Sequence, residues 1–436
     1  MRYSIRDNIR IAQTRNASTE DIVVVDNRTD DKYMINRAMY DVIRHINEGD
    51  IPVAELSNAL NKKFNFTHKA LGGTIDYLSK EKIIIPTEKK IRNLNILDLY
   101  PGNYVLNRIA LEVTEHCNLR CKHCYGGYGE RNPKALSLDF IKSLMPELDK
   151  LNAHSVMLTG GEFFLHPDYN EMFALFKSRG YSLSLLTNGF LSDKVRTFVN
   201  DNRDVSFILK VSLDGFEDTH NFLRGNKQSY QKACETLTFL KDCSHVKPYI
   251  SISLGKHNID GVKYFHNFVK KEFGFSTTTD LMFPTEHNRH FQEMIFRPED
   301  FDDLNCRYPE YFQNKAKGGS KSDKNAPRCV AAREMATLSA DKTLKICNNA
   351  VADRFHFGSL ERASLTELWE HPPAHIDRFR RERNCDVAAC RQCEFYSRCV
   401  ITNCRTLAYY YTGDPGNPNP IVCFAQSKYS NENHTH

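Results

Sequence analysis

Six short apolar, β-prone runs recur between residues 108 and 283, and stretches with helical spacing separate them. Strands that alternate with helices predict βαβ units, and such units build a parallel sheet. Six units in a row predict an α/β fold with a partial (β/α)6 barrel of the TIM type, assigned to residues 105–313. The chemistry of such barrels lies at the carboxyl ends of the strands. The predicted strands are residues 108–116, 155–162, 182–188, 207–213, 249–254 and 277–283.

The first ninety residues show a different pattern, which does not fit the barrel. Two β-prone segments around a polar turn predict a β-hairpin, and three helical stretches and a short strand follow. This order predicts a small winged helix-turn-helix domain at residues 1–90, with residues 91–104 as a linker. The hairpin strands are residues 22–26 and 31–35, the helices are residues 37–48, 53–64 and 67–81, and the last strand is residues 83–86.

Composition divides the remainder of the chain. Residues 314–327 are polar and rich in Gly, Ser and Lys, which predicts a flexible loop. A cysteine-rich segment follows at residues 328–426, and the polar tail at residues 427–436 is expected to be disordered.

The chain has 14 cysteines, most of which are expected to bind metal, whereas Cys234 and Cys243 are expected to be structural thiols. The N-terminus lacks the apolar segment of a signal peptide, and no apolar run reaches 18 residues, so we expect a cytoplasmic protein without a membrane span. In that compartment, abundant cysteine favours metal sites over disulfides.

Three of these cysteines form the most specific motif in the sequence. Cys117, Cys121 and Cys124 are spaced by four and three residues and follow the first predicted barrel strand. Three thiolates on one loop can hold three irons of a 4Fe–4S cluster and leave the fourth iron open to a ligand. A zinc site or three reduced core thiols is the alternative on spacing alone, although zinc sites normally add a distant pair of ligands.

Other polar motifs fall at the ends of later predicted strands. They are Gly160-Gly161-Glu162, Thr187-Asn188-Gly189 and Ser212-Leu213-Asp214-Gly215, with Leu223-Arg224-Gly225 further on. Because the carboxyl ends of parallel strands meet on one face, we expect these segments to converge on the cysteine loop.

This combination resembles the radical S-adenosylmethionine (SAM) superfamily over residues 105–285. The resemblance implies that the three cysteines hold the cluster and that the open iron binds SAM. It further implies that the reduced cluster breaks SAM to form a 5′-deoxyadenosyl radical. The implied SAM-binding residues are Gly160, Gly161, Glu162, Asn188, Ser212 and Arg224. Each residue also has a purely structural alternative. Glu162 could be an exposed acid in a turn, Ser212 a cap at a strand end and Arg224 a surface cation.

The C-terminal cysteines resemble the SPASM extension of radical SAM enzymes that modify peptides. The resemblance implies two auxiliary 4Fe–4S clusters and three clusters in all. The first auxiliary set is Cys329, Cys347 and Cys404, with Cys306 or Cys385 as a candidate fourth ligand, and the second is Cys390, Cys393, Cys399 and Cys423. Two features depart from the family: four residues separate Cys399 from Cys404, and Lys342 stands where a glycine is usual. Zinc ribbons are the alternative for this segment.

The N-terminal domain has two candidate partners. A DNA reader needs a basic face on its second helix, but that helix carries only Lys62 and Lys63, and the whole chain has a net charge of +5. We therefore expect no nucleic acid partner. The domain resembles the recognition domain that binds the leader of a precursor peptide, which implies leader pairing with the strand edge at residues 22–26 and 31–35. A stabilising cap without a ligand is the alternative.

The predicted function is that of a radical SAM enzyme that oxidatively crosslinks a ribosomally made peptide through a thioether, C–C or C–O bond. A flavodoxin or ferredoxin is the expected electron donor. An anaerobic sulfatase maturase is the second enzyme hypothesis, although Asn348 stands where that family has an aspartate base after Cys347. An iron–sulfur or zinc-containing winged-helix regulator is the hypothesis without enzymatic activity.

Overall fold

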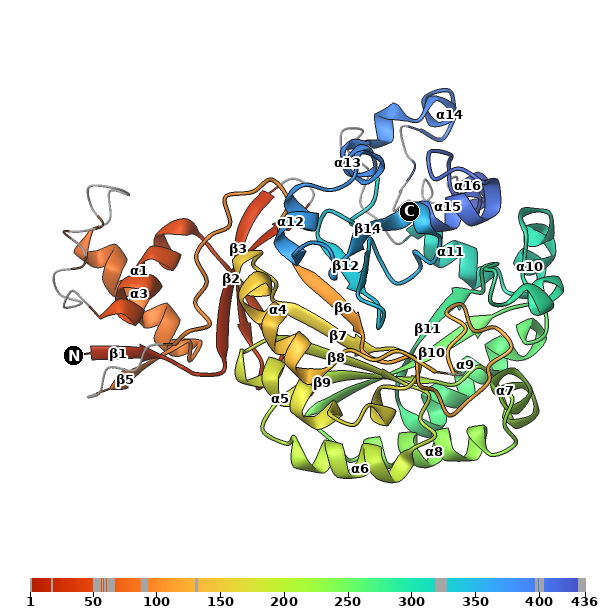
Figure 1. Ribbon diagram of the computed structural model, residues 1–436, viewed down its shortest axis with the longest axis horizontal. Helices are drawn as coiled ribbons and strands as arrows, with labels where there is room; N and C mark the ends of the chain where they lie inside the picture. Colours follow the sequence, from red (N-terminus) through yellow and green to blue (C-terminus); the bar gives the residue numbers. More distant parts are fainter. Residues whose placement is uncertain are drawn as a thin grey trace, which may run out of the picture.

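The computed structural model describes residues 2–16, 19–49, 56, 58, 60, 67–87, 93–129, 132–317, 328–396, 399 and 404–429. Figure 1 shows a small N-terminal lobe beside a larger body with a long curved sheet. Most of the predicted helix at residues 53–64, residues 318–327 of the predicted loop and residues 430–436 of the predicted tail lie outside the described residues. Residues 314–317 of the predicted loop and residues 427–429 of the predicted tail are helical, so the prediction was wrong there. No helix within the described ranges is long and apolar enough to cross a membrane.

Six parallel strands form the central part of the large sheet, as predicted. Each strand pairs with the next one along the chain, which is the order expected of consecutive βαβ units. The strands are β6 (Arg108–Glu112), β7 (Ser155–Thr159), β8 (Ser182–Thr187), β9 (Phe207–Ser212), β10 (Val246–Leu254) and β11 (Ser276–Leu281).

Helices connect these strands along the outside of the sheet (Figure 1). Ser137 begins the first of them, because its hydroxyl accepts a hydrogen bond from the Phe140 amide at 3.2 Å. Buried aliphatic and aromatic side chains fill the space between strands and helices and form one continuous core. The helices are α4 (Leu138–Lys150), α5 (Tyr169–Ser178), α6 (Ser192–Asp201), α7 (Glu217–Arg224), α8 (Ser229–Leu240) and α9 (Ile259–Phe273), with a 3-10 turn at Phe163–Leu165.

The cysteine-rich segment extends the same sheet. β12 (Met335–Leu338) pairs in parallel with β6, and β13 (Thr343–Lys345) and β14 (His356–Ser359) continue it antiparallel. Lys342, in the turn between β12 and β13, has a φ of +66°, the left-handed conformation that glycine adopts most easily. The turn therefore has the backbone that the usual glycine would provide.

Short helices complete the C-terminal half. They are α10 (Phe301–Arg307), α11 (Pro309–Lys317), α12 (Leu365–Glu370), α13 (Ala374–Arg381), α14 (Ala388–Arg391), α15 (Arg405–Thr412) and α16 (Pro420–Tyr429). Single 3-10 turns lie at Arg289–Met294, Pro298–Asp300, Asp353–Phe355 and Asn384–Asp386.

The N-terminal lobe contains a three-stranded antiparallel sheet with its own core. The predicted hairpin is confirmed as β3 and β4, but β2 and the pairing of β1 with β5 were not predicted. Because the middle helix lies outside the described residues, the winged helix stays a prediction. The elements are β1 (Arg2–Ile5), β2 (Ile9–Asn16), β3 (Thr19–Asp26), β4 (Asp31–Ile35), α1 (Arg37–Glu48), α3 (His68–Lys80) and β5 (Ile84–Thr87).

This lobe docks at the amino ends of the barrel strands. The turn between β3 and β4 contacts the start of β8, where Ser182 Oγ donates to Asp30 Oδ1 at 2.6 Å. It also contacts the residue before β9, because Ser206 N donates to Asn27 O at 2.9 Å. Arg10 of β2 is fully buried in the junction. The lobe therefore lies on the face opposite the carboxyl ends of the strands.

Candidate active site

The cysteine loop begins just after β6, at the carboxyl ends of the strands. Cys117, Cys121 and Cys124 are half-buried, and all 14 cysteines of the chain are free thiols. Burial raises the pKa of Cys117 to about 12, and the neighbouring Cys121 and Cys124 add to the effect. Such thiols lose their protons when iron binds them, so the donor set fits an iron–sulfur cluster.

Gly160 and Gly161 pack directly against the segment that leads into this loop. Gly161 N donates to Thr114 O at 2.7 Å, and Glu162 N donates to His116 O at 2.8 Å. A Cβ atom on Gly160 would collide with the Thr114 carbonyl, and one on Gly161 would collide with that of His116. The two glycines are thus required for the approach of β7 to the cysteine loop.

Glu162 is buried at the same end of the sheet. Its carboxylate accepts hydrogen bonds from Asn188 N at 2.8 Å and Thr187 Oγ1 at 2.9 Å. Burial raises the pKa of Glu162 to about 7, although these hydrogen bonds favour the charged form. Asn188 in turn donates from Nδ2 to Asn118 Oδ1 at 2.9 Å, which links β8 to the cysteine loop. Asn118 was not among the predicted site residues, because no sequence pattern distinguishes it from the other polar residues of the loop.

Arg224 is directed toward two groups of the site. It forms an ion pair of 2.7 Å with the buried Asp214, and its Nη1 donates to Cys121 Sγ at 3.8 Å. Ser212 ends β9, two residues before Asp214. The structure therefore brings all the predicted SAM-site segments to one end of the sheet, while Arg224 already has partners within the protein.

Three buried histidines surround Asp214. Within the described part of the chain, His123 Nδ1, His220 Nε2 and both ring nitrogens of His257 lack hydrogen-bond partners. Burial lowers the pKa of His123 and His257 to about 4, so their rings are neutral and can donate and accept. Orphaned polar atoms at this depth fit a site that receives a polar ligand.

The cysteines of each predicted auxiliary set lie near one another, and their role as cluster ligands stays a prediction. The thiols of Cys329 and Cys347 lie close enough to Cys404 for its charge to raise their pKa, although burial is the larger cause. Cys306 is exposed on α10, in the neighbourhood of Lys428. The structure thus groups Cys329, Cys347 and Cys404, three of the five candidate ligands of the first auxiliary set.

The second auxiliary set lines a cavity of about 430 Å³. Cys390, Cys393, Cys399 and Cys423 all contribute to its wall, together with mostly apolar side chains. No three His, Cys, Asp or Glu side chains in the described ranges converge as ligands of a single metal ion. A 4Fe–4S cluster needs a wider arrangement, because the iron–sulfur cube stands between its cysteines.

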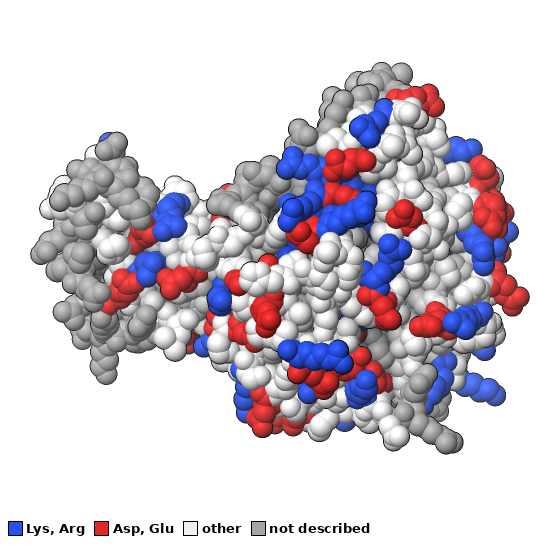
Figure 2. Space-filling view, turned by 45° about the horizontal axis from the view of Figure 1, so that its top comes forward, with Lys and Arg blue, Asp and Glu red and all other residues white. Residues whose placement is uncertain are grey.

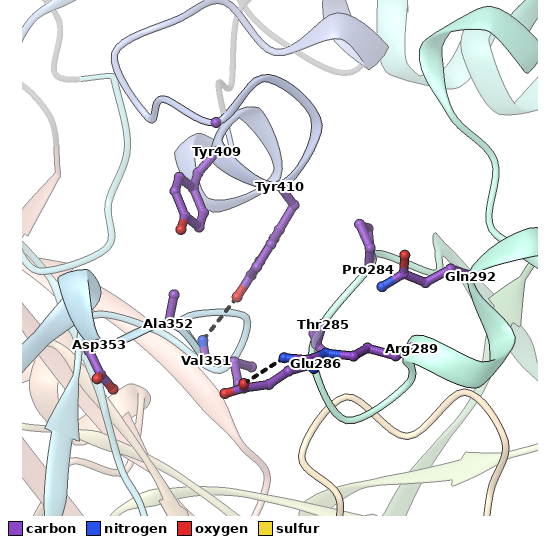
Figure 3. Close-up of a pocket in the computed structure, with 11 residues that line it drawn as sticks. Pro284, Thr285, Glu286, Arg289, Gln292, Val351, Ala352, Asp353, Tyr409 and Tyr410 are labelled. Carbon is purple, nitrogen blue, oxygen red and sulfur yellow. Dashed lines mark hydrogen bonds and ion pairs between the residues drawn. The ribbon is translucent and has the colours of Figure 1, made fainter.

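A second cavity, of about 590 Å³, opens between the barrel and the cysteine-rich segment. Figure 3 shows its wall, which includes the loop after β11, the loop after β13 and α15. Tyr410 reaches across from α15, and its hydroxyl accepts from Val351 N at 3.1 Å. The Tyr410 ring stacks on the Phe283 ring, with the ring centroids 4.9 Å apart. The Phe283 ring also contacts the Tyr125 ring, with a centroid distance of 6.0 Å. Two ring contacts therefore connect this cavity with the residue after Cys124.

Comparison with protein families shows which domains the two cysteine-bearing segments of the chain belong to. Residues 111–296 match the radical SAM superfamily, and residues 329–394 match the SPASM iron–sulfur cluster-binding domain. Residues 111–296 therefore form a radical SAM domain and residues 329–394 a SPASM domain, and the chain is an enzyme.

Individual relatives are distant. The chain is 33% identical over 137 residues to the antilisterial bacteriocin subtilosin biosynthesis protein AlbA of Bacillus subtilis, which covers 30% of each chain. It is 24% identical over 330 residues to the mycofactocin maturase MftC of Mycolicibacterium smegmatis, covering 72% of this chain and 81% of that protein. The structure of Streptococcus suis SuiB bound to precursor peptide SuiA matches with a TM-score of 0.60, 12% identity, and coverage of 97% and 99%. This last likeness shows the fold alone.

Proposed function

We propose that the chain is a maturase that cleaves SAM reductively and oxidatively crosslinks a ribosomally made precursor peptide. The observation that carries the proposal is the convergence of the cysteine loop, Gly160-Gly161-Glu162 and Ser212 beside a cavity shared with the SPASM segment. The named roles of AlbA and MftC in biosynthesis and maturation support a peptide-derived substrate.

In this proposal Cys117, Cys121 and Cys124 hold the SAM cluster, and Glu162 and Ser212 help to bind SAM. When bound, these cofactors supply a 5′-deoxyadenosyl radical that removes hydrogen from an unactivated carbon. The chain itself orients the ligand and excludes water: Glu162 is 1% exposed and held by backbone hydrogen bonds.

The two auxiliary sets give the electron of an oxidative reaction a destination. Forming one crosslink removes two hydrogens from the peptide, and one electron must leave the substrate as the new bond closes. The cysteines that line the 430 Å³ cavity and the group around Cys404 would hold the clusters that accept it. A flavodoxin or ferredoxin is the proposed source of the first electron.

The formylglycine reaction of sulfatase maturases is less well supported. Asn348 follows Cys347, and its side-chain oxygen accepts a hydrogen bond from Thr337 Oγ1 at 2.9 Å. An amide held in this way cannot take a proton as a carboxylate would.

The proposed leader site is the outer edge of β4. β3 pairs on both sides, whereas β4 pairs with β3 alone among the described strands. An extended peptide could add to this edge through main-chain hydrogen bonds. Figure 2 shows acidic and basic side chains interspersed over the face drawn, without a continuous basic stripe that would favour nucleic acid.

The test is an anaerobic incubation of the reconstituted enzyme with SAM, a reductant and the precursor encoded beside it. We expect 5′-deoxyadenosine and a peptide that has lost two hydrogens per crosslink, with a lower rate for a precursor that lacks its leader. A Cys117→Ala variant is the control and should form neither product. SAM cleavage with a peptide of unchanged mass would refute crosslinking.

A further inference from the structure

Two buried arginines flank one carboxylate among the auxiliary cysteines. Arg328 directly precedes Cys329, and Arg405 directly follows Cys404. The Arg328 side chain is fully buried, the Arg405 side chain is 3% exposed, and both form ion pairs with Glu382. We term these three residues the auxiliary triad; their two positive charges and one negative charge give it a net charge of +1.

The surrounding backbone holds both guanidinium groups in place. Arg405 Nη1 donates to Phe379 O at 2.6 Å, and its Nε donates to Pro415 O at 3.1 Å. The Arg405 Cζ lies 3.7 Å from the centroid of the Phe379 ring. Arg328 Nη2 donates to Asn417 O at 2.8 Å. These contacts tie the triad to α13, α15 and the turn before α16, so its charges occupy fixed positions.

The triad lies between the two auxiliary cysteine sets. The Arg405 backbone N–H donates a hydrogen bond to the Cys329 sulfur of the first set. Burial lowers the pKa of Arg328, whereas the charges of Glu382 and Cys390 oppose this effect, so Arg328 also lies near the second set. Arginine keeps its charge in proteins, so the triad presents a lasting positive charge to both sets.

We propose that the auxiliary triad consists of positioning residues that raise the reduction potentials of the auxiliary clusters, so that these clusters accept the electron that leaves the substrate. The inference rests on the proposed function, because it needs clusters on the auxiliary cysteines. It does not depend on which peptide bond is formed.

The physical reason is the charge that reduction adds. As the crosslink closes, the peptide radical is oxidised by one electron, the attacking group loses its proton to solvent, and the electron reduces an auxiliary cluster. The reduced cluster is more negative by one charge, and reduction breaks no bond. A buried positive charge stabilises the more negative state, because little water screens it.

Removing one positive charge of the triad should lower the ratio of reduced to oxidised cluster about tenfold at a fixed potential, as expected for a unit charge near a buried centre. This change corresponds to about 59 mV for one electron.

The experiment is a redox titration of the full-length holoenzyme, followed by electron paramagnetic resonance with dithionite as the reductant. The auxiliary signals are those that persist in an enzyme with alanine at Cys117, Cys121 and Cys124. Iron content is measured in every variant, so that the loss of a cluster is distinguished from a shift of its potential.

Four variants separate the charge of the triad from its packing. Arg405→Gln removes a positive charge, and Arg405→Lys keeps the charge but loses the planar contacts of the guanidinium. Glu382→Gln removes the negative charge and keeps an oxygen that can accept a hydrogen bond. Arg378→Gln is the matched control, because Arg378 lies 3.7 Å from the same carboxylate but its side chain is 84% exposed, so water screens its charge.

The expected shifts have opposite signs. Arg405→Gln should lower the auxiliary potentials by the amount given above, and Arg405→Lys should leave them within a threefold change of the reduced-to-oxidised ratio. Glu382→Gln should raise them, by less than Arg405→Gln lowers them, because the Glu382 side chain is 22% exposed. Arg378→Gln should not change them.

A purely structural triad would give a different result. Arg405→Gln and Glu382→Gln both weaken the same ion pair, so they would then shift the potentials in the same direction or not at all, and either outcome would overturn the inference. If Arg405→Gln loses its clusters, the rise in Glu382→Gln is the deciding result. A wild-type enzyme that holds no auxiliary cluster would overturn the proposed function as well.

Discussion

Replacing Arg10 with alanine should loosen the junction between the N-terminal lobe and the barrel. The Arg10 side chain is fully buried and makes five hydrogen bonds across the junction. Its guanidinium lies 2.8 Å from Asp149 Oδ1 and reaches the carbonyls of Ala153 and Arg179, while its planar face stacks on Tyr181 at 3.9 Å. Alanine removes every one of these contacts.

The expected loss is about 3–5 kcal/mol, the usual cost of breaking a buried ion pair from one side. The expected loss in Arg10→Ala lies near the lower end of this range, because Asp149 keeps a second ion pair with Arg179. The Ala153 carbonyl accepts two hydrogen bonds from Arg10 and would lose both inside the junction. A loss of about 3 kcal/mol raises the open population of the junction more than a hundredfold.

Hydrogen exchange of the β2 amides measures this population directly. We expect exchange at least a hundredfold faster in Arg10→Ala if β2 opens by separation of the lobe. Arg44→Ala is the control: its partners Glu48 and Asp98 are at 2.9 and 3.3 Å on the surface, so the loss should stay below about 1 kcal/mol. Equal exchange in wild type and Arg10→Ala would refute the role assigned to the junction.

Two further predictions concern a buried histidine and the glycine pair. Burial, with the nearby Lys32 and Arg10, lowers the pKa of His154 to about 3, against 6.5 for the exposed ring. Between these values only the unfolded chain binds the proton, so stability falls as the pH falls. In urea unfolding, the wild-type free energy of unfolding should fall between pH 7 and pH 5 by about 2 kcal/mol more than that of His154→Leu. An equal fall in the two proteins would contradict this prediction. Gly161→Ala should cost about 1–3 kcal/mol and lower the iron content. Gly261→Ala, in helix α9 with open space where its Cβ would lie, should not destabilise the fold or lower the iron content.

The parallel sheet and the first cysteine loop could be predicted because their signals are local. Each barrel strand is a short apolar run, and each turn at a strand end carries its own polar residues. The three cysteines at 117, 121 and 124 share one loop by virtue of spacing alone. The closeness of Cys404 to Cys329 and Cys347 followed from the family resemblance, since 75 and 57 residues separate them and periodicity cannot place them.

The junction and the partners of Arg224 could not be predicted, because they depend on contacts between residues that are far apart in the sequence. Arg10 reads as one polar residue in an alternating strand, and its partners lie 139 to 171 residues away. Arg224 follows a pattern that suggested a ligand for SAM, and the fold also brings it to Asp214, 10 residues away, and to Cys121, 103 residues away. A polar residue in a motif shows that chemistry is nearby; its actual partner depends on distant packing.

The positions of the two proposed peptide sites constrain the substrate. The lobe that carries β4 docks at the amino ends of the barrel strands, whereas the cysteine loop lies at their carboxyl ends (Figure 1). A strand of six residues, such as β8, spans roughly 20 Å at about 3.3 Å per residue, and the loops at each end add to this distance. A leader paired with β4 therefore cannot place adjacent residues at the cluster. If β4 binds the leader as proposed, the precursor needs a spacer of at least about six extended residues, and leader binding and the chemistry then act on separate parts of one peptide.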